Sequence, residues 1–389
     1  MTTPPPSNTG TNFTDATKVE QLTSHTYSAS FPDDWCIGSV PHGGFITAVF
    51  LQVSTLHFST TLRTQNQPNP ITLHLEFLRR TQTGPALFTV QDTKLGRQTS
   101  VLHITLSQGD RVEVVGYITH SNTSTETGVS SPHTHVLHPT PLPVSIPLLK
   151  TNTDPNYHLQ AMPFPKFRKA TTKSQIYSPQ TQPSPIISDE WIRLSTGEPW
   201  TNTSLGYACD MFPLPTDFLS ASTPTQTQNH PSNAKYWFPT LLLSIDFKKT
   251  LPTQGIEWLF IRIERKQTRN GRMDIAMTAW DEEGELVAIS NHVALVVSSE
   301  RNTSARSEVK GGKKIGGVDV CTLHRAIELD LEDGDSALLV YRNYVQPRSL
   351  CLSMPKYDCS AEKNLQVKEE PKCNLEQSET SHVITSPNR

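Results

Sequence analysis

Residues 73–81 read LHLEFLRRT and residues 243–250 read LSIDFKKT, so one short pattern occurs twice in the chain. In both places apolar residues alternate with polar ones up to an acid and a phenylalanine, and a basic pair follows. Phe77 in the first copy corresponds to Phe247 in the second. Alternation with a period of two is typical of a strand with one buried face. The pattern therefore predicts one strand at each position.

Two further landmarks follow each copy in the same order. Gly96-Arg97 corresponds to Gly271-Arg272, and a turn at Gly109 corresponds to one at Gly284. Strand patterns separated by glycine turns lie at 71–77, 86–95, 98–108 and 112–119, and again at 186–194, 240–247, 258–265, 272–280 and 286–297. These matches predict a tandem repeat of one unit built around an antiparallel meander.

A helix pattern that opens on two glycines precedes the first meander. Residues 39–50 read SVPHGGFITAVF, and from 42 to 58 apolar residues recur every three or four positions, which predicts a helix with one buried face. A side-chain cap is the usual start of a helix. Gly43 and Gly44 instead leave the first N–H groups open to a ligand carbonyl, or let the helix pack tightly on its sheet. A shorter helix is predicted at 204–219, around GYACDMF.

The repeats and the changes in composition predict five segments. Proline-rich stretches such as HPTPLPVSIPLL do not suit sheet or helix interiors, and the ends of the chain are rich in small, polar or charged residues. We predict a disordered N-terminal tail at 1–20, an N-terminal unit at 21–125, a Pro-rich linker at 126–185, a C-terminal unit at 186–300 and a mostly disordered C-terminal tail at 301–389.

Composition narrows the classes of function. The 389 residues carry a net charge of −3, which argues against a nucleic-acid partner. The six cysteines lack zinc-type spacing, so we expect free thiols and no metal site, and we predict no cofactor. The sequence shows no signal peptide, no segment apolar enough to span a membrane and no peroxisomal tripeptide at its end, and we therefore expect a cytoplasmic protein.

Five motifs in this order resemble the double-hotdog acyl-CoA thioesterases of the thioesterase II type. They are HGGF (42–45), HLEFLRR (74–80), YACDMF (207–212), TLLLSIDF (240–247) and ELVAISNHVAL (285–295). The resemblance covers about 27–119 and 186–297. It implies an α+β tandem hotdog fold, in which an antiparallel sheet wraps a long helix in each unit.

The same resemblance suggests a site for thioester hydrolysis. The acidic residue of the family corresponds to Asp210 and its threonine to Thr240, while His292 stands where the bacterial enzymes hold a glutamine. Asp210 would be the base or orient the water, Thr240 would bind the water, and His292 would orient it or carry a proton. The N–H groups at His42, Gly43 and Gly44 would bind the substrate oxyanion. Because the sites of hotdog folds form between two units, the resemblance also implies that the start of the first-unit helix faces Asp210 of the second unit.

The substrate implied is an acyl-CoA, or an acyl chain on a carrier. The basic pairs Arg79-Arg80 and Lys248-Lys249 could contact the phosphates of coenzyme A, although charged strand ends are common without a ligand. The main alternative is a non-catalytic protein that binds acyl chains or a partner. Hydration or dehydration of an enoyl thioester is a weaker alternative, because no histidine lies near Asp210 on one helix. Both a monomer and a homo-oligomer are compatible with the sequence.

Overall fold

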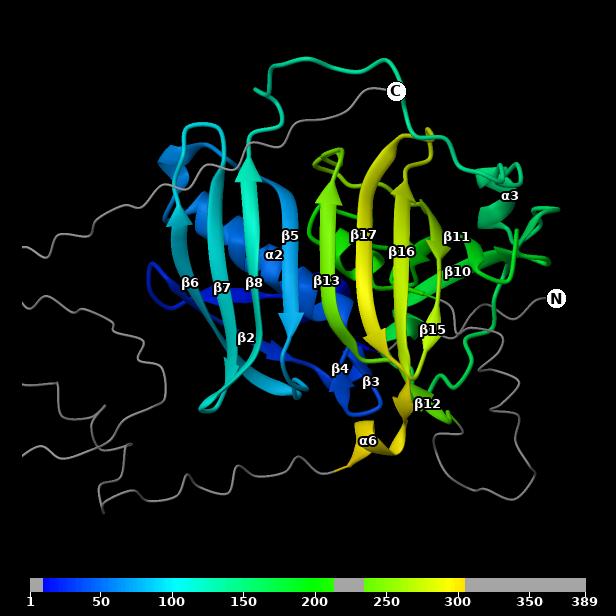
Figure 1. Cartoon of the computed structure of the whole chain (residues 1–389), viewed down its shortest axis with the longest axis horizontal. Helices are drawn as coiled ribbons and strands as arrows, with labels where there is room; N and C mark the ends of the chain where they lie inside the picture. Colours follow the sequence, from blue (N-terminus) through cyan, green and yellow to red (C-terminus); the bar gives the residue numbers. More distant parts are fainter. Residues whose placement is uncertain (1–9, 213–233, 305–389) are drawn as a thin grey trace, which may run out of the picture. The chain divides into compact units, whose positions relative to one another are not determined.

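The computed structural model describes residues 10–212 and 234–304, which form an α+β fold around one large antiparallel sheet (Figure 1). This sheet has 14 strands, and the order along it is β1-β2-β6-β7-β8-β5-β13-β17-β16-β14-β11-β10-β9, with β15 paired to β16. The N-terminal unit supplies β1 (Val19–Gln21), β2 (Thr26–Phe31), β5 (Asn69–Phe77), β6 (Gly84–Lys94), β7 (Ser100–Gln108) and β8 (Arg111–Ser121). The C-terminal unit supplies β9 (Tyr157–Leu159), β10 (Ser174–Pro179), β11 (Ile187–Leu194), β13 (Thr240–Phe247), β14 (Leu259–Glu264), β15 (Thr268–Arg269), β16 (Arg272–Trp280) and β17 (Leu286–Leu295).

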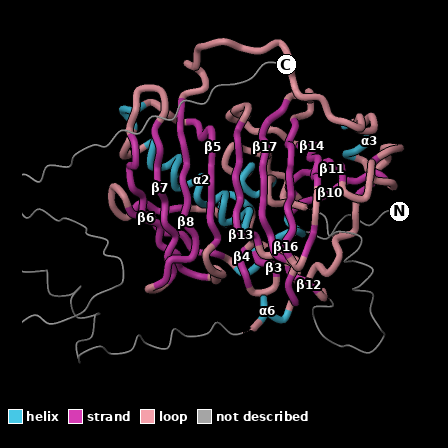
Figure 2. The backbone as a smooth tube through the Cα atoms, viewed as in Figure 1, coloured by secondary structure: helices cyan, strands magenta, loops and turns pink. Residues whose placement is uncertain are grey.

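One long helix and several short elements accompany the sheet. The α-helices are α1 (Phe13–Ala16), α2 (Gly43–Ser59), α3 (Ile146–Lys150), α4 (Leu205–Ala208) and α6 (Glu300–Thr303). Single turns of 3-10 helix lie at Asp33–Trp35, Arg63–Gln65 and Ala170–Lys173. Two small ribbons pair β3 (Cys36–Ile37) with β4 (Val40–Pro41), and β12 (Tyr236–Trp237) with β18 (Val297–Ser298). Figure 2 shows how strand dominates the described backbone.

The two units join edge to edge where β5 pairs antiparallel with β13 (Figure 1). His74 lies directly opposite Ser244, and His74 Nδ1 is 2.8 Å from the Ser244 hydroxyl oxygen. These two residues occupy the same place in the predicted repeat, since Phe77 and Phe247 each follow three positions later. An antiparallel pair in which equivalent residues face each other is centred on a pseudo-twofold axis. The strand register therefore confirms the repeat alignment predicted from the sequence.

Helix α2 is buried more completely than its periodicity predicts. Every residue from Gly44 to Leu51 is buried, and not one face only. The reason is that the helix has neighbours on several sides. The strands of the first unit cover one side, α4 packs on another, and the Trp35 ring stacks on Phe45 with a centroid separation of 5.4 Å. A helix enclosed on several sides is apolar around most of its circumference.

The predicted segment boundaries differ from the structure at three places. The N-terminal tail already contains α1 and β1, and Phe13 of α1 is buried. The Pro-rich linker is a connector only in part, because its second half contains β9 and β10, which extend the sheet beyond β11. At the C-terminal boundary, α6 continues to Thr303 and buries Asn302. The rest of the predicted C-terminal tail, from residue 305, lies outside the described residues.

The second predicted helix is short in the described chain. Helix α4 ends at Ala208, and a turn at Cys209-Asp210 follows. The part of the predicted helix after residue 212 lies outside the described residues. In the part of the chain that the structure describes, no helix is both long and apolar enough to cross a membrane.

Candidate active site

The two glycines at the start of α2 lie against a turn from the other unit. His42 is the N-cap residue, and its Nδ1 accepts a hydrogen bond from the Gly44 N–H at 3.1 Å. The same N–H also donates to Oδ2 of Asp210 at 2.6 Å. The group that approaches the helix start is therefore a carboxylate placed 166 residues later in the chain. A negative charge at this position is stabilised by the helix dipole.

Close approach explains why both positions are glycine. A Cβ at Gly43 would lie 2.7 Å from Asp210 Oδ2. A Cβ at Gly44 would lie 2.7 Å from Asp210 Cβ and 2.8 Å from the carbonyl oxygen of Tyr207. Contacts under about 3 Å between such atoms are strongly repulsive. Any larger residue would push the Asp210 turn away from the helix.

Three predicted residues converge at Asp210. The Thr240 hydroxyl donates to Asp210 Oδ1 at 3.2 Å, and His292 Nδ1 lies 3.2 Å from the same oxygen. On the other oxygen, His42 Nδ1 is 3.5 Å from Oδ2. The approach of His292 is close enough for electrostatic attraction but is not aligned as a hydrogen bond. Asp210, Thr240 and His292 come from the turn after α4, from β13 and from β17, so the fold brings together side chains that are distant in sequence.

The surroundings keep the Asp210 carboxylate ionised although it is buried. Burial by itself raises the pKa of Asp210. The contact with His292, the electrostatic attraction to the His42 and His292 rings and the Gly44 N–H together outweigh burial, so the pKa lies below its usual range. For His42, burial lowers the pKa more than the Asp210 charge raises it. At neutral pH the site therefore combines an aspartate anion with a neutral His42 imidazole.

His292 lies behind the carboxylate and not at the open side of the site. Its side chain is buried, and its Nε2 is 3.2 Å from the hydroxyl oxygen of Ser290, which donates to the Cys209 carbonyl oxygen. His292 thus links β17 to the turn that carries Asp210. Ser290 could have been found from the sequence, because it lies two positions before His292 and shares its strand face.

A cavity of about 560 Å³ opens in front of the carboxylate. His42, Gly43, Asp210 and Thr240 form its polar end, whereas Gly44 and His292 do not line it. Much of the remaining wall is apolar, with side chains that include Phe77, Phe164, Phe167, Phe212, Trp237 and Phe238. Cavities of this size and character hold small organic ligands in many proteins.

Arg168 is a cavity residue that the sequence did not reveal. It lies in the segment predicted as a linker, and one of its guanidinium N–H groups donates to the Phe212 carbonyl oxygen at 3.4 Å. Burial lowers its pKa to about 10, although the nearby Glu190 opposes this effect. Arg168 therefore remains charged at neutral pH. No pattern in the proline-rich sequence around it places this residue at a site.

The two predicted basic pairs lie in different surroundings. Arg79 and Arg80 line the cavity, where Arg79 donates to the Val112 carbonyl oxygen at 2.8 Å and Arg80 to the carbonyl oxygens of Arg301 and Asn302. Lys248 and Lys249 are not among the lining residues. Lys248 faces Asp246 at 3.6 Å, and Lys249 is held by Asp281 and Glu285. The repeat therefore explains the second pair without a ligand.

Comparisons with known proteins identify the family of the chain. Residues 31–121 match the family model of the acyl-CoA thioesterase N-terminal domain, and residues 147–296 match that of the C-terminal domain. The thioesterase-like protein TwmA of Talaromyces wortmannii is 36% identical over 333 residues, which cover 76% of this chain and 94% of TwmA.

Two solved structures share the fold. One is a hotdog-fold protein of unknown function from Alicyclobacillus acidocaldarius, with a TM-score of 0.56 and 15% identity over 74% of this chain and 98% of that one. The other is a thioesterase II-type protein from Thermobifida fusca, with a TM-score of 0.54 and 19% identity over 73% and 97%. They confirm the predicted tandem hotdog fold. Since both domain models match in the expected order and TwmA matches across nearly its whole length, the chain belongs to the acyl-CoA thioesterase family.

Proposed function

We propose that the protein hydrolyses an acyl-CoA, or a related carrier-bound acyl thioester, to the free acid and the thiol. The observation that carries this proposal is the Asp210 carboxylate, which is buried yet ionised and lies at one end of a cavity that also has a group of aromatic side chains in its wall. The aromatic wall would hold the acyl chain, and the polar end would hold the thioester group. Membership of the thioesterase family supports the same reaction class.

Asp210 would act as the general base, and Thr240 would orient the attacking water. The water oxygen forms a bond to the thioester carbon while Asp210 accepts the water proton, and the carbonyl oxygen becomes an oxyanion. When the tetrahedral intermediate collapses, the carbon–sulfur bond breaks, and the proton on Asp210 passes to the leaving thiolate. The carboxylate is thereby restored for the next turnover.

Gly43 is the best-placed donor for the oxyanion. It lines the cavity, and as the first residue of α2 it has an N–H without an acceptor inside the helix. The N–H of Gly44 already donates to Asp210, so we assign it to holding the carboxylate. His292, which does not line the cavity, is assigned as a positioning residue that acts through Asp210. Arg79 and Arg80 remain candidates for contact with the coenzyme A phosphates, whereas Lys248 and Lys249 do not.

Free-thiol release from acyl-CoAs of increasing chain length tests the proposal. Asp210→Asn keeps the shape of the side chain but removes the base, so we expect the rate to fall by about 10²- to 10⁴-fold. Asp246→Asn is a matched control, because Asp246 is exposed on β13 and does not line the cavity, and its rate should equal the wild-type rate. A wild-type protein that binds acyl-CoA but releases no thiol would overturn the proposal and favour the acyl-binding alternative.

A further inference from the structure

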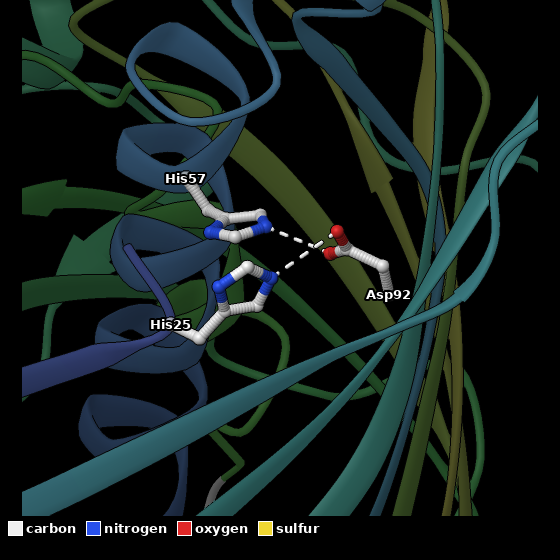
Figure 3. A group of neighbouring side chains, drawn as sticks. All are labelled: His25, His57 and Asp92. Atoms are coloured by element: carbon white, nitrogen blue, oxygen red, sulfur yellow. Dashed lines mark hydrogen bonds and ion pairs between the residues drawn. The ribbon is translucent and has the colours of Figure 1, made fainter. Parts of the chain in front are cut away.

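A second polar cluster lies at the opposite end of α2 from the cavity. His25, His57 and Asp92 each offer one ligand atom, and these three atoms lie within 4.8 Å of one another. His57 Nε2 is 2.9 Å from Asp92 Oδ1, and His25 Nε2 is 3.2 Å from Asp92 Oδ2. Figure 3 shows both imidazole rings turned towards the single carboxylate. From Gly43 to His57 the chain rises about 20 Å along the helix, so the cluster is separate from the catalytic cavity.

Three elements hold the cluster in place. His57 is in the last turn of α2, His25 directly precedes β2, and Asp92 is on β6. The carbonyl oxygen of His25 accepts a hydrogen bond from the Val90 N–H at 2.9 Å, which fixes this segment to β6. The register between β6 and β7 shifts immediately after Asp92. Such irregularities often direct a side chain towards a functional position.

A second layer of hydroxyl groups orients both imidazole rings. His57 Nδ1 lies 2.7 Å from the Tyr27 hydroxyl oxygen, and His25 Nδ1 lies 2.8 Å from the Ser24 hydroxyl oxygen. The Tyr27 hydroxyl can donate to the Ser24 carbonyl oxygen at 3.2 Å, and it is then free to accept from an Nδ1–H of His57. In that tautomer the Nε2 lone pair of His57 faces the carboxylate, as a metal ligand requires. Metal-bound histidines commonly show this arrangement, in which the second ring nitrogen bonds an oxygen.

Burial and exposure also suit a cation. His57 is fully buried, so its ring is held firmly against Asp92. The side chains of His25 and Asp92 are 42% and 21% exposed, which leaves an entry path from solvent. The cluster then offers two imidazole nitrogens and one carboxylate oxygen on one side, with the solvent side open.

We propose that His25, His57 and Asp92 form a binding site for one divalent first-row transition-metal ion, with zinc as the reference ion. Imidazole nitrogen is a preferred ligand of zinc, whereas calcium and magnesium prefer sites made of oxygen atoms. With three protein ligands, water would occupy the remaining position. The ion would tie the end of α2 to β6 and to the segment before β2, so its binding stabilises the N-terminal unit.

The test uses the full chain without a polyhistidine tag, stripped with a chelator and then titrated with zinc. Two quantities are measured. Calorimetry gives the number of zinc ions bound, and thermal unfolding gives the midpoint temperature. The matched variants are Asp92→Asn and His25→Ala, both at positions open to solvent. His103→Ala, on β7, is the control because His103 contacts the Tyr117 ring and has no place in the cluster.

We expect each cluster variant to bind one zinc ion fewer than the wild type, or to bind it at least 100-fold more weakly. The control should bind as the wild type does. Zinc should raise the unfolding midpoint of the wild type and the control only, and magnesium should raise it in none of the proteins. Circular dichroism of each apo variant excludes misfolding as the cause. Equal zinc binding by wild type and both cluster variants, or no binding by the wild type, would overturn the proposal.

Discussion

The two repeats have matching strands but different residues at the positions that build the cavity's polar end. Thr240 in the second repeat corresponds to Pro70 in the first, and a register shift directly follows both residues. His292 lies opposite Leu243, and its counterpart Ile118 lies opposite Leu73, the residue equivalent to Leu243. A hydroxyl and an imidazole in one repeat are thus replaced by two apolar side chains in the other.

Asp210 of the second repeat is also replaced by an apolar residue in the first repeat. Gly44 of α2 lies against Asp210, and Gly206 of α4 lies against Ala48, where an added Cβ would be 2.9 Å from the Ala48 N atom. Ala48 therefore takes the place of Asp210 on the other side of the pseudo-twofold axis. Among the described residues, Asp210, Thr240 and His292 therefore gather on one side of the axis, and apolar residues occupy the equivalent places on the other side. The first repeat supplies the helix start and the second supplies the carboxylate, so each repeat is incomplete without the other.

Among the variants that compare the two repeats, the largest effect on the rate is expected from filling the space between the helix start and the carboxylate. In Gly44→Ala the added Cβ meets Asp210 and the Tyr207 carbonyl oxygen, which displaces the turn. We expect thiol release to fall about 100-fold, since a small misplacement of a reacting group has effects of this size. Overpacking should also destabilise the fold by about 1–3 kcal/mol.

Gly206→Ala is the matched variant on the other side of the axis. It should destabilise the fold by a similar amount, because its Cβ also meets backbone atoms, those of Ala48. The rate per folded molecule should fall much less, since Ala48 has no part in the reaction. Chemical denaturation and thiol release measured on the same samples separate the two effects. Equal rate losses per folded molecule would contradict the asymmetry between the repeats.

The next effect on the rate is expected when His292 is replaced by isoleucine, the residue type at the equivalent position of the first repeat. His292→Ile removes the imidazole beside Asp210 and leaves the carboxylate with weaker support, so its pKa should rise. We expect hydrolysis to fall about tenfold, in line with the loss of an interaction with a charged group. The acid limb of the pH–rate profile should move to higher pH, which a purely structural defect would not cause.

His292→Gln distinguishes the possible roles of this side chain. An amide can still interact with Asp210 but cannot carry a proton. If His292 only positions the carboxylate, the glutamine variant should retain most of the wild-type rate and its pH profile. A loss as large as that of the isoleucine variant would show that the imidazole itself transfers a proton.

The sequence predicted the strands of the second repeat well, because strands rest on local patterns. The predicted strand at 240–247 coincides with β13, and the strand at 272–280 coincides with β16. The convergence of Asp210, Thr240 and His292 was expected only from the order of family motifs, and the structure brings the three side chains together. Their catalytic roles remain predictions.

Contacts between distant segments could not be predicted in the same way. The sequence explained the glycines of α2 by a ligand or by tight packing on the sheet, and their position opposite Asp210 was expected only from the way hotdog units pair, not from any local pattern. Arg168 and the cluster of His25, His57 and Asp92 are formed by single residues on separate elements, without periodicity or spacing. Such sites depend on how strands register and pack, which local patterns do not encode.

An effect on stability, not on the rate, should distinguish the repeats in acid. Buried His120 of the first repeat has its pKa lowered by burial to about 3, and its counterpart in the second repeat is Ala294. The unfolded chain binds a proton at this histidine below about pH 6.5, whereas the folded chain does not until about pH 3. Stability is therefore complete above this window and falls as the pH decreases through it, by on the order of 2–3 kcal/mol at about pH 4.5.

Denaturation at neutral pH and at about pH 4.5 measures this contribution. His120→Gln should be less stable than the wild type at neutral pH, because the stacking on Phe58 is lost, but it should lose less stability in acid. His103→Gln is the control, since this histidine lies near the surface on the neighbouring strand β7. If the acid-induced change in the free energy of unfolding is the same in all three proteins, His120 is not its source.

The smallest effect is expected at the centre of the pseudo-twofold axis, where His74 and Ser244 face each other. Ser244→Ala removes one partly exposed hydrogen bond, so it should destabilise the fold by about 0.5–1.5 kcal/mol and leave hydrolysis unchanged. A double-mutant cycle with His74→Ala should give a coupling energy no larger than this. The small value follows from the fold, since β5 and β13 still pair along their length and α4 still packs on α2. A much larger coupling energy, or a loss of activity, would mean that this single pair and not the extended sheet and helix contacts holds the repeats in register.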